Sequence, residues 1–151
     1  MSNISMTTSK RNAIVTVMLI SAFVSMLNQT ILNTALPAII KGLNITETTA
    51  QWLITGFMLV NGIMIPLTAF LMDKYSTRHL YIFSMAIFLI GSIVAAFSPT
   101  FTILMISRII QAIGAGILLP LMQFTVFTLF PAEQRGFAMG LAGVVVQSAP
   151  A

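Results

Sequence analysis

The chain alternates between long apolar runs and short polar stretches, and this pattern sets the elements that it predicts. The apolar runs cover residues 13–36, 50–72, 80–97 and 101–130, and a further one begins at 137. An α-helix rises about 1.5 Å per residue, so about 20 apolar residues are enough to cross the hydrocarbon core of a bilayer. The pattern therefore predicts helical membrane spans at the four complete runs and the start of a fifth span.

Residues at the ends of the runs predict where the helices begin and end. Pro37 follows the first run and is expected to end it, because proline removes a helical hydrogen bond. Thr48 and Gln51 have the spacing of a capping box, so they are expected to open the second span. The polar stretches that remain are expected to be turns between the spans, at 73–79, 98–100 and 131–136.

The composition indicates that these apolar helices belong to a membrane protein. Only 7% of the residues are charged, whereas a soluble domain has about 25%. The net charge of +4 comes from basic residues that stand singly between apolar runs, so it indicates no nucleic-acid partner. There is no cysteine for a disulfide or a thiolate metal site. The predicted fold class is an all-α, polytopic membrane helix bundle.

The basic residues near the span ends predict an orientation. Lys41 alone falls on one side of the membrane. The other side carries Lys10, Arg11, Lys74, Arg78 and Arg135. Cytoplasmic loops carry the excess of basic residues. We therefore expect a multi-pass protein of the bacterial plasma membrane, with residues 1–12 as a cytoplasmic tail and residues 13–151 as the transmembrane bundle.

Polar side chains gather in the first span and have two interpretations. They form hydrogen bonds between helices, or they line a polar cavity. An amide has several donors and acceptors to satisfy, which favours the cavity for the amides. The predicted cavity residues are Asn28, Gln29, Asn33 and, in the second span, Asn61. Gly62 and Pro66, one turn apart, permit close packing or a kink.

Arg108 is the only formally charged residue between His79 and Glu133. It lies about 12 Å from the end of the fourth run, too deep for its head group to reach water. An uncompensated arginine in this position costs at least about 2.5 kcal/mol. Arg108 shares a helical face with Gln111, Ala112 and Ala115. It is either a structural brace to amides of another helix or, as we favour, a fixed charge for ion coupling or for contact with an anionic group.

Four segments, in order along the chain, resemble motifs of the major facilitator superfamily, in particular its drug:proton antiporter branch with fourteen spans. They are "LNQTILNTALP" at 27–37, "AFLMDKYSTRHLYI" at 69–82, "RIIQAIGAG" at 108–116 and "PAEQRGFAMG" at 131–140. The resemblance covers about residues 13 to 151. It implies the N-terminal part of a longer transporter, whose remaining C-terminal spans would be partners of this bundle.

The resemblance also implies roles for single residues. Arg108 and Gln111 belong to the motif linked to proton coupling. A cytoplasmic gate that closes in the outward-facing state would contain Asp73, Lys74, Arg78 and Glu133.

The sequence departs from the family pattern at several positions. Ala69, Ser76 and Ala112 stand where glycine is usual. Asn28 stands where drug-exporting relatives usually have an aspartate, and no acidic residue lies within any predicted span. This argues against a preference for cationic substrates, unless later spans supply the acid.

The function that we expect is proton-coupled efflux of small lipophilic molecules by alternating access, without a cofactor or a metal. An enzyme would need paired acids, a histidine pair or a nucleophile with its base within the spans, and only Asp73 and His79, at the membrane edge, come near this requirement. One alternative is a small, self-contained, four-span oligomeric exporter, but those depend on a glutamate in the first span. The other is a non-transporting membrane scaffold, which would not need Arg108.

Overall fold

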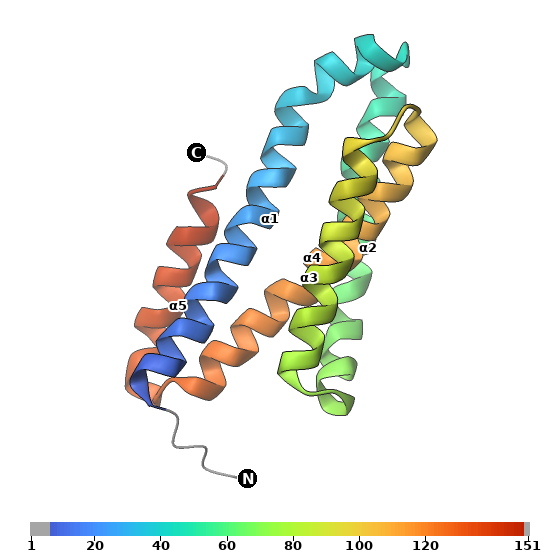
Figure 1. Ribbon diagram of the computed structural model, residues 1–151. Coiled ribbons are helices and arrows are strands. Elements are labelled where there is room, and N and C mark those ends of the chain that lie inside the picture. The colour runs from blue at the N-terminus through green and yellow to red at the C-terminus, as the bar shows by residue number, and fades with distance from the viewer. Residues whose placement is uncertain (1–6, 150–151) are drawn as a thin grey trace.

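The computed structural model describes residues 7–149, which form helices and no strand (Figure 1). The helices are α1 (Thr8–Leu43), α2 (Glu47–Lys74), α3 (Thr77–Ala96), α4 (Phe101–Leu129) and α5 (Ala132–Gln147). Successive helices run in opposite directions, so the beginning of α1, the α2–α3 turn and the α4–α5 turn lie at one end of the bundle (Figure 1). The predicted all-α fold class is confirmed.

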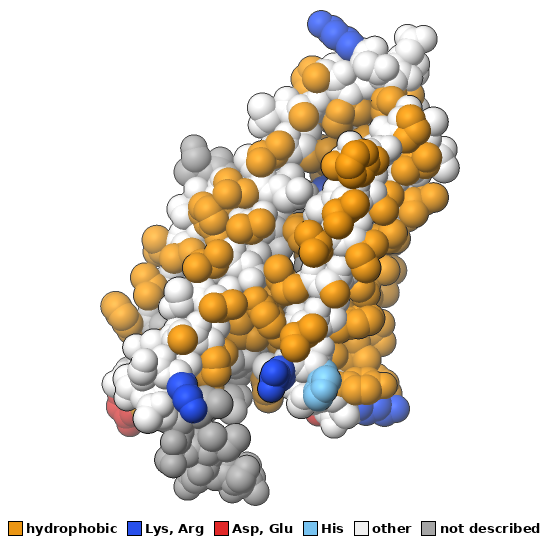
Figure 2. All heavy atoms as spheres, viewed as in Figure 1, with side chains coloured by type: hydrophobic (Ala, Val, Ile, Leu, Met, Phe, Trp, Pro, Cys, Tyr) orange, Lys and Arg blue, Asp and Glu red, His pale blue; other side chains and the backbone are white. Residues whose placement is uncertain are grey.

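Within the described residues, four helices, α1 to α4, are long and apolar enough to cross a membrane. Large apolar side chains remain exposed along their outer faces, as Figure 2 shows for one side of the bundle. Most of the Lys and Arg side chains in that view lie at the end where α1 begins. An apolar middle with charged ends matches a bilayer and its two aqueous interfaces. The fold is therefore that of a multi-pass membrane protein.

Helix α4 lies at the centre of the bundle. Half of its most apolar segment is buried (50%), compared with 22% for α3. It packs against α3 and α2 most extensively, and also against α1 and α5. The charged and amide side chains of α4 are therefore enclosed by other helices, whereas α3 presents most of its surface outwards.

Glycines allow the backbones of α3 and α4 to approach closely. A Cβ atom at Gly114 would lie 2.6 Å from the carbonyl oxygen of Ser84, and one at Gly91 would lie 2.9 Å from the backbone nitrogen of Gln111. Small residues at such crossings replace side-chain volume with direct backbone packing. This contact holds α4 in a fixed rotation against α3.

Gly116 has the same role between α4 and α2. A Cβ atom there would lie 2.5 Å from Cβ of Met64, and the Thr68 hydroxyl donates a 3.2 Å hydrogen bond to the Gly116 carbonyl. Of the two expectations for Gly62 and Pro66, close packing is not found at Gly62, because nothing lies within 4 Å of a Cβ placed there, and a kink stays untested. The close approach of α2 to α4 is instead made possible by Gly116 of α4.

The expected end of the first helix at Pro37 is wrong. Pro37 lies inside α1, which continues to Leu43. Proline removes one backbone hydrogen bond from a helix, and here the helix continues past that loss. The helix ends where Asn44 adopts the left-handed conformation (φ 51°, ψ 48°), which asparagine tolerates better than most residues.

The expected capping box at Thr48 and Gln51 is also wrong, because both residues are already helical. Thr46 caps α2 instead, and its hydroxyl oxygen accepts a 3.2 Å hydrogen bond from the backbone N–H of Thr49. Glu47 then occupies the first turn, where a carboxylate is favoured by the helix dipole.

Two of the three expected turns are shorter than the polar sequence suggested. Residues 73–74 end α2 and residues 77–79 begin α3, so only Tyr75 and Ser76 separate these helices. Helix α5 begins at Ala132, directly after Pro131, and not at 137. Polar residues continue a helix beyond its apolar segment when they face water. The expected turn at 98–100 is confirmed.

Candidate functional site

Arg108 is buried at the centre of the bundle, with 2% of its surface exposed. Its Nη1 donates a 2.7 Å hydrogen bond to Oε1 of Gln111, one turn later on α4, and a 3.1 Å hydrogen bond to Oδ1 of Asn28 on α1. Its guanidinium lies over the Phe57 ring of α2, 4.4 Å from the ring centroid, within the range of a cation–π interaction. Arg108 therefore connects α4 to α1 and α2.

Gln111 extends this network to α3. Its Nε2 donates a 3.1 Å hydrogen bond to the Ser92 hydroxyl, which itself donates to the backbone oxygen of Phe88 at 2.9 Å. Gln111 is 1% exposed. The network thus runs from Asn28 through Arg108 and Gln111 to Ser92, and it joins α1, α4 and α3 through neutral partners.

The other edge of the guanidinium has no partner. Nε and Nη2 of Arg108 are buried without a hydrogen-bond acceptor in the described part of the chain. The chain's three acidic residues are Glu47, Asp73 and Glu133, and each lies in the first or last turn of its helix. Unpaired charged donors are costly away from water. The positive charge of Arg108 is therefore not neutralised by any of these acids.

The expected polar face of the fourth span is confirmed as a buried face. Gln111, Ala112 and Ala115 are buried with Arg108. Amide side chains accept from the guanidinium, as expected, and one of them belongs to another helix. The hydrogen bonds of Arg108 to these amides are the contacts that a structural brace requires. The role of the same residues in transport stays a prediction.

Of the four amides predicted to line a substrate cavity, only Asn28 belongs to this network. Gln29 is partly buried and Asn33 is exposed on α1. Oδ1 of Asn61 is buried without a donor, beside Gly116 of α4. The structure does not bring the four amides together around one space, so the cavity stays a prediction.

The four predicted gate residues lie at the same end of the bundle and are exposed. Asp73 and Lys74 end α2, Arg78 is in the first turn of α3, and Glu133 is in the first turn of α5. Lys74 lies over the Phe70 ring at 4.5 Å. None of the hydrogen bonds described for residues 7–149 joins two of these four side chains, so their pairing also stays a prediction.

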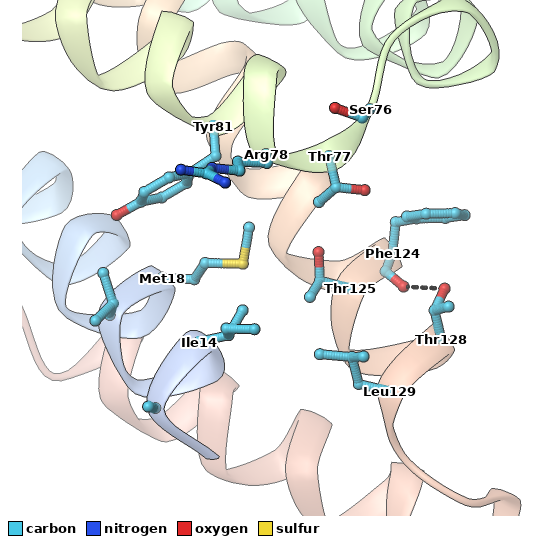
Figure 3. Close-up of a pocket in the computed structure, with 12 residues that line it drawn as sticks. Ile14, Met18, Ser76, Thr77, Arg78, Tyr81, Phe124, Thr125, Thr128 and Leu129 are labelled. Carbon is cyan, nitrogen blue, oxygen red and sulfur yellow. Dashed lines mark hydrogen bonds between the residues drawn. The ribbon is translucent and has the colours of Figure 1, made fainter. Parts of the chain in front are cut away.

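A cavity of about 750 Å³ opens at this end, between α1, α3 and α4 (Figure 3). Most of its wall is apolar, with Ile14 and Met18 from α1 and Leu129 from α4. Arg78 and Tyr81 extend into it from α3 (Figure 3), and the Tyr81 hydroxyl lies 2.6 Å from the Ser21 hydroxyl of α1. The cavity is separate from the Arg108 network, because the two have no residue in common.

Sequence reasoning missed Phe57, Ser92 and Tyr81 as contacts of polar residues. Each stands singly in an apolar run, so helical periodicity alone did not indicate a contact with a polar residue there. Close packing at glycines accompanies the contacts of Phe57 with Arg108 and of Ser92 with Gln111, between α2 and α4 and between α3 and α4. Among the described residues, no cluster of His, Cys, Asp and Glu could hold a metal ion.

A model of the Major Facilitator Superfamily matches residues 18–151. The chain belongs to this superfamily. The resemblance inferred from the four motifs is therefore confirmed, and the buried arginine lies within the part of the chain that matches the superfamily.

Bacterial relatives extend this assignment. An uncharacterized MFS-type transporter of Bacillus subtilis, YcnB, is 54% identical over 141 residues, 93% of this chain and 30% of that protein. The lincomycin resistance protein LmrB of the same organism is 44% identical over 134 residues (89% and 28%). The multidrug export protein EmrB of Haemophilus influenzae is 30% identical over 131 residues (87% and 26%). These names point to transport rather than catalysis, and the chain spans less than a third of each relative.

Proposed function

We propose that this chain acts as the N-terminal part of a proton-coupled transporter that exports small lipophilic molecules by alternating access. The observation that carries the proposal is the buried, un-neutralised Arg108 with neutral partners on α1 and α4. The names of LmrB and EmrB support export as the direction and drugs as the substrates. The remaining spans of the complete protein would form the second bundle against which this one moves.

The role of Arg108 in coupling follows from electrostatics. A fixed cation favours the charged form of a nearby carboxylate and so promotes release of its proton. In this proposal the proton-carrying acid comes from the remaining spans, because the apolar runs at 13–36, 50–72, 80–97 and 101–130 contain no Asp or Glu. In our proposal, movement between the bundles brings that acid towards Arg108 and away from it. Gln111 holds the guanidinium in place through its 2.7 Å hydrogen bond.

The orientation and the gate form part of the same proposal. The end of the bundle with most of the basic residues would face the cytoplasm (Figure 2). There Asp73, Lys74, Arg78 and Glu133 are exposed, so they are available to pair with one another or with the second bundle when the transporter faces outwards. Lys41 lies at the opposite end of α1, in its last turn.

The test is substrate export by the complete protein in inside-out vesicles. The first compounds to try are lincomycin, which the relative LmrB is named for, and lipophilic compounds without a positive charge. An imposed pH gradient, acidic inside, should drive their accumulation, and nigericin, which collapses that gradient, should stop it. Accumulation that survives nigericin would contradict proton coupling. A complete protein that moves neither these compounds nor other lipophilic drugs under the gradient would contradict the export proposal.

A further inference from the structure

We propose that the free edge of Arg108 binds the carboxylate of the transported molecule, so that the transporter selects lipophilic organic anions. This inference rests on the proposed function and specifies its substrate class. The charge balance is the first argument for it. Arg108 is a buried cation whose hydrogen-bond partners, Asn28 and Gln111, are neutral amides. An anion that reaches such a cation forms charge-assisted hydrogen bonds with it, which are stronger than those of a neutral group.

The geometry of the guanidinium is the second argument. Both described hydrogen bonds use Nη1, whereas Nε and Nη2 are buried without partners. The N–H groups of Nε and Nη2 point to the same side of the planar group. This is the edge that holds the two oxygens of a carboxylate by parallel hydrogen bonds. The unpartnered atoms are thus the pair that a carboxylate requires.

The surroundings of Arg108 fix the position of this edge. The Phe57 ring covers one face of the guanidinium at 4.4 Å. The two amides hold Nη1 at 2.7 Å and 3.1 Å, so the group is oriented before any ligand arrives. A preorganised site loses less entropy on binding.

Access to the edge requires movement between helices. Among the described side-chain hydrogen bonds, the contact of Arg108 with Asn28 is the only one between α1 and α4. A single bond to a neutral amide is weaker than an ion pair with a carboxylate would be. A local separation of α1 from α4, within this bundle, can therefore expose the edge without breaking a salt bridge.

The experiment measures equilibrium binding of matched probes to the complete, purified transporter without a proton gradient. The probes are 1-pyrenebutyrate, which carries a carboxylate, and 1-pyrenebutanamide, which has the same ring and chain but no charge. We expect 1-pyrenebutyrate to bind at least about tenfold more tightly, because hydrogen bonds to charged groups contribute more than neutral ones. Equal affinity for the two probes in the unmodified protein would overturn the inference, and this comparison depends on no variant.

Variants then assign the preference to this edge. Arg108→Gln should abolish it, and Arg108→Lys should reduce it, because a point charge cannot form the paired hydrogen bonds. Asn28→Asp should also reduce binding of 1-pyrenebutyrate at least about tenfold, because an internal carboxylate would then take the cation. Lys41→Gln, which removes an exposed cation at the far end of α1, should change nothing. A carboxylate preference that survives Arg108→Gln would overturn the inference.

Two competing results remain distinguishable. If a carboxylate from the remaining spans occupies the edge, the unmodified protein will show no preference between the probes, and the inference fails. Gradient-driven export of other compounds would in that case leave the proposed function intact. Conversely, an Arg108-dependent carboxylate preference without any response of transport to the pH gradient would support the anion site and contradict proton coupling.

Discussion

Arg108 on α4 donates a 3.1 Å hydrogen bond from Nη1 to Oδ1 of Asn28 on α1, 80 residues earlier in the chain. This bond joins the first and fourth helices at the only charged position within the predicted spans. A positive charge that is hydrogen-bonded to a neutral amide keeps its net charge and can still attract an anion. A carboxylate partner would neutralise that charge. In the proposed function, the identity of residue 28 therefore decides whether Arg108 can interact with a group from outside this bundle.

Asn28→Asp in the complete transporter should increase export of lipophilic cations and add a dependence on pH. The new carboxylate would neutralise Arg108 when ionised, and it could exchange protons. The measurement is ethidium efflux from energised cells or vesicles at several external pH values. Asn28→Ala is the control, because it removes the acceptor without adding an acid and should gain no pH dependence. An unchanged ethidium profile in Asn28→Asp would show that this position does not contact the transport pathway.

Gly116→Ala should destabilise the complete protein by about 1–3 kcal/mol, the range typical of overpacking in a well-packed core. The added Cβ would lie 2.5 Å from Cβ of Met64 and 2.9 Å from Oδ1 of Asn61. Gly62→Ala is the matched control, because a Cβ there meets nothing within 4 Å. The measurement is the thermal unfolding midpoint in detergent. Equal midpoints for the two variants would contradict the close packing of α4 on α2.

Single cysteines can test the orientation, because residues 1–151 contain no cysteine. In a complete protein whose other cysteines have been replaced, Lys41→Cys should react with an impermeant maleimide added to intact cells. Ser76→Cys, at the α2–α3 turn, should react only after the membrane is permeabilised. These two positions serve as controls for each other. The reverse labelling pattern would invert the proposed topology.

Much of the fold could be predicted because apolar runs have the length that a bilayer requires. The buried face of α4 was also predictable, since Arg108, Gln111 and Ala112 recur at helical spacing. The end of α1 was not, because one hydrogen bond lost at Pro37 did not end the helix. The end of α2 and the beginnings of α3 and α5 were also predicted wrongly, because these helices continue past the apolar run into polar residues that face water.

For the hydrogen-bond partners of Arg108, the sequence predicted the kind of side chain but not the individual residues. Sequence indicated that amides would surround Arg108, but it did not identify Asn28 as the acceptor or Ser92 as the end of the network. Those contacts depend on how far each helix is rotated and shifted along its neighbour. Periodicity within one helix does not contain that information. The glycine contacts of α4 with α2 and α3 help to set it for Ser92, but none of them involves α1 and Asn28.

The most direct test of the account is proton movement upon addition of substrate to the complete transporter in liposomes that contain a pH-sensitive dye. The unmodified protein should move protons when an exported compound is added, and Lys41→Ala should behave in the same way. Arg108→Ala should move none above protein-free liposomes, and Arg108→Lys should recover little, because an ammonium cannot replace a planar guanidinium that uses separate edges for separate partners. If correctly folded Arg108→Ala moves protons at the unmodified rate, Arg108 is a structural brace and the proposed coupling role is wrong.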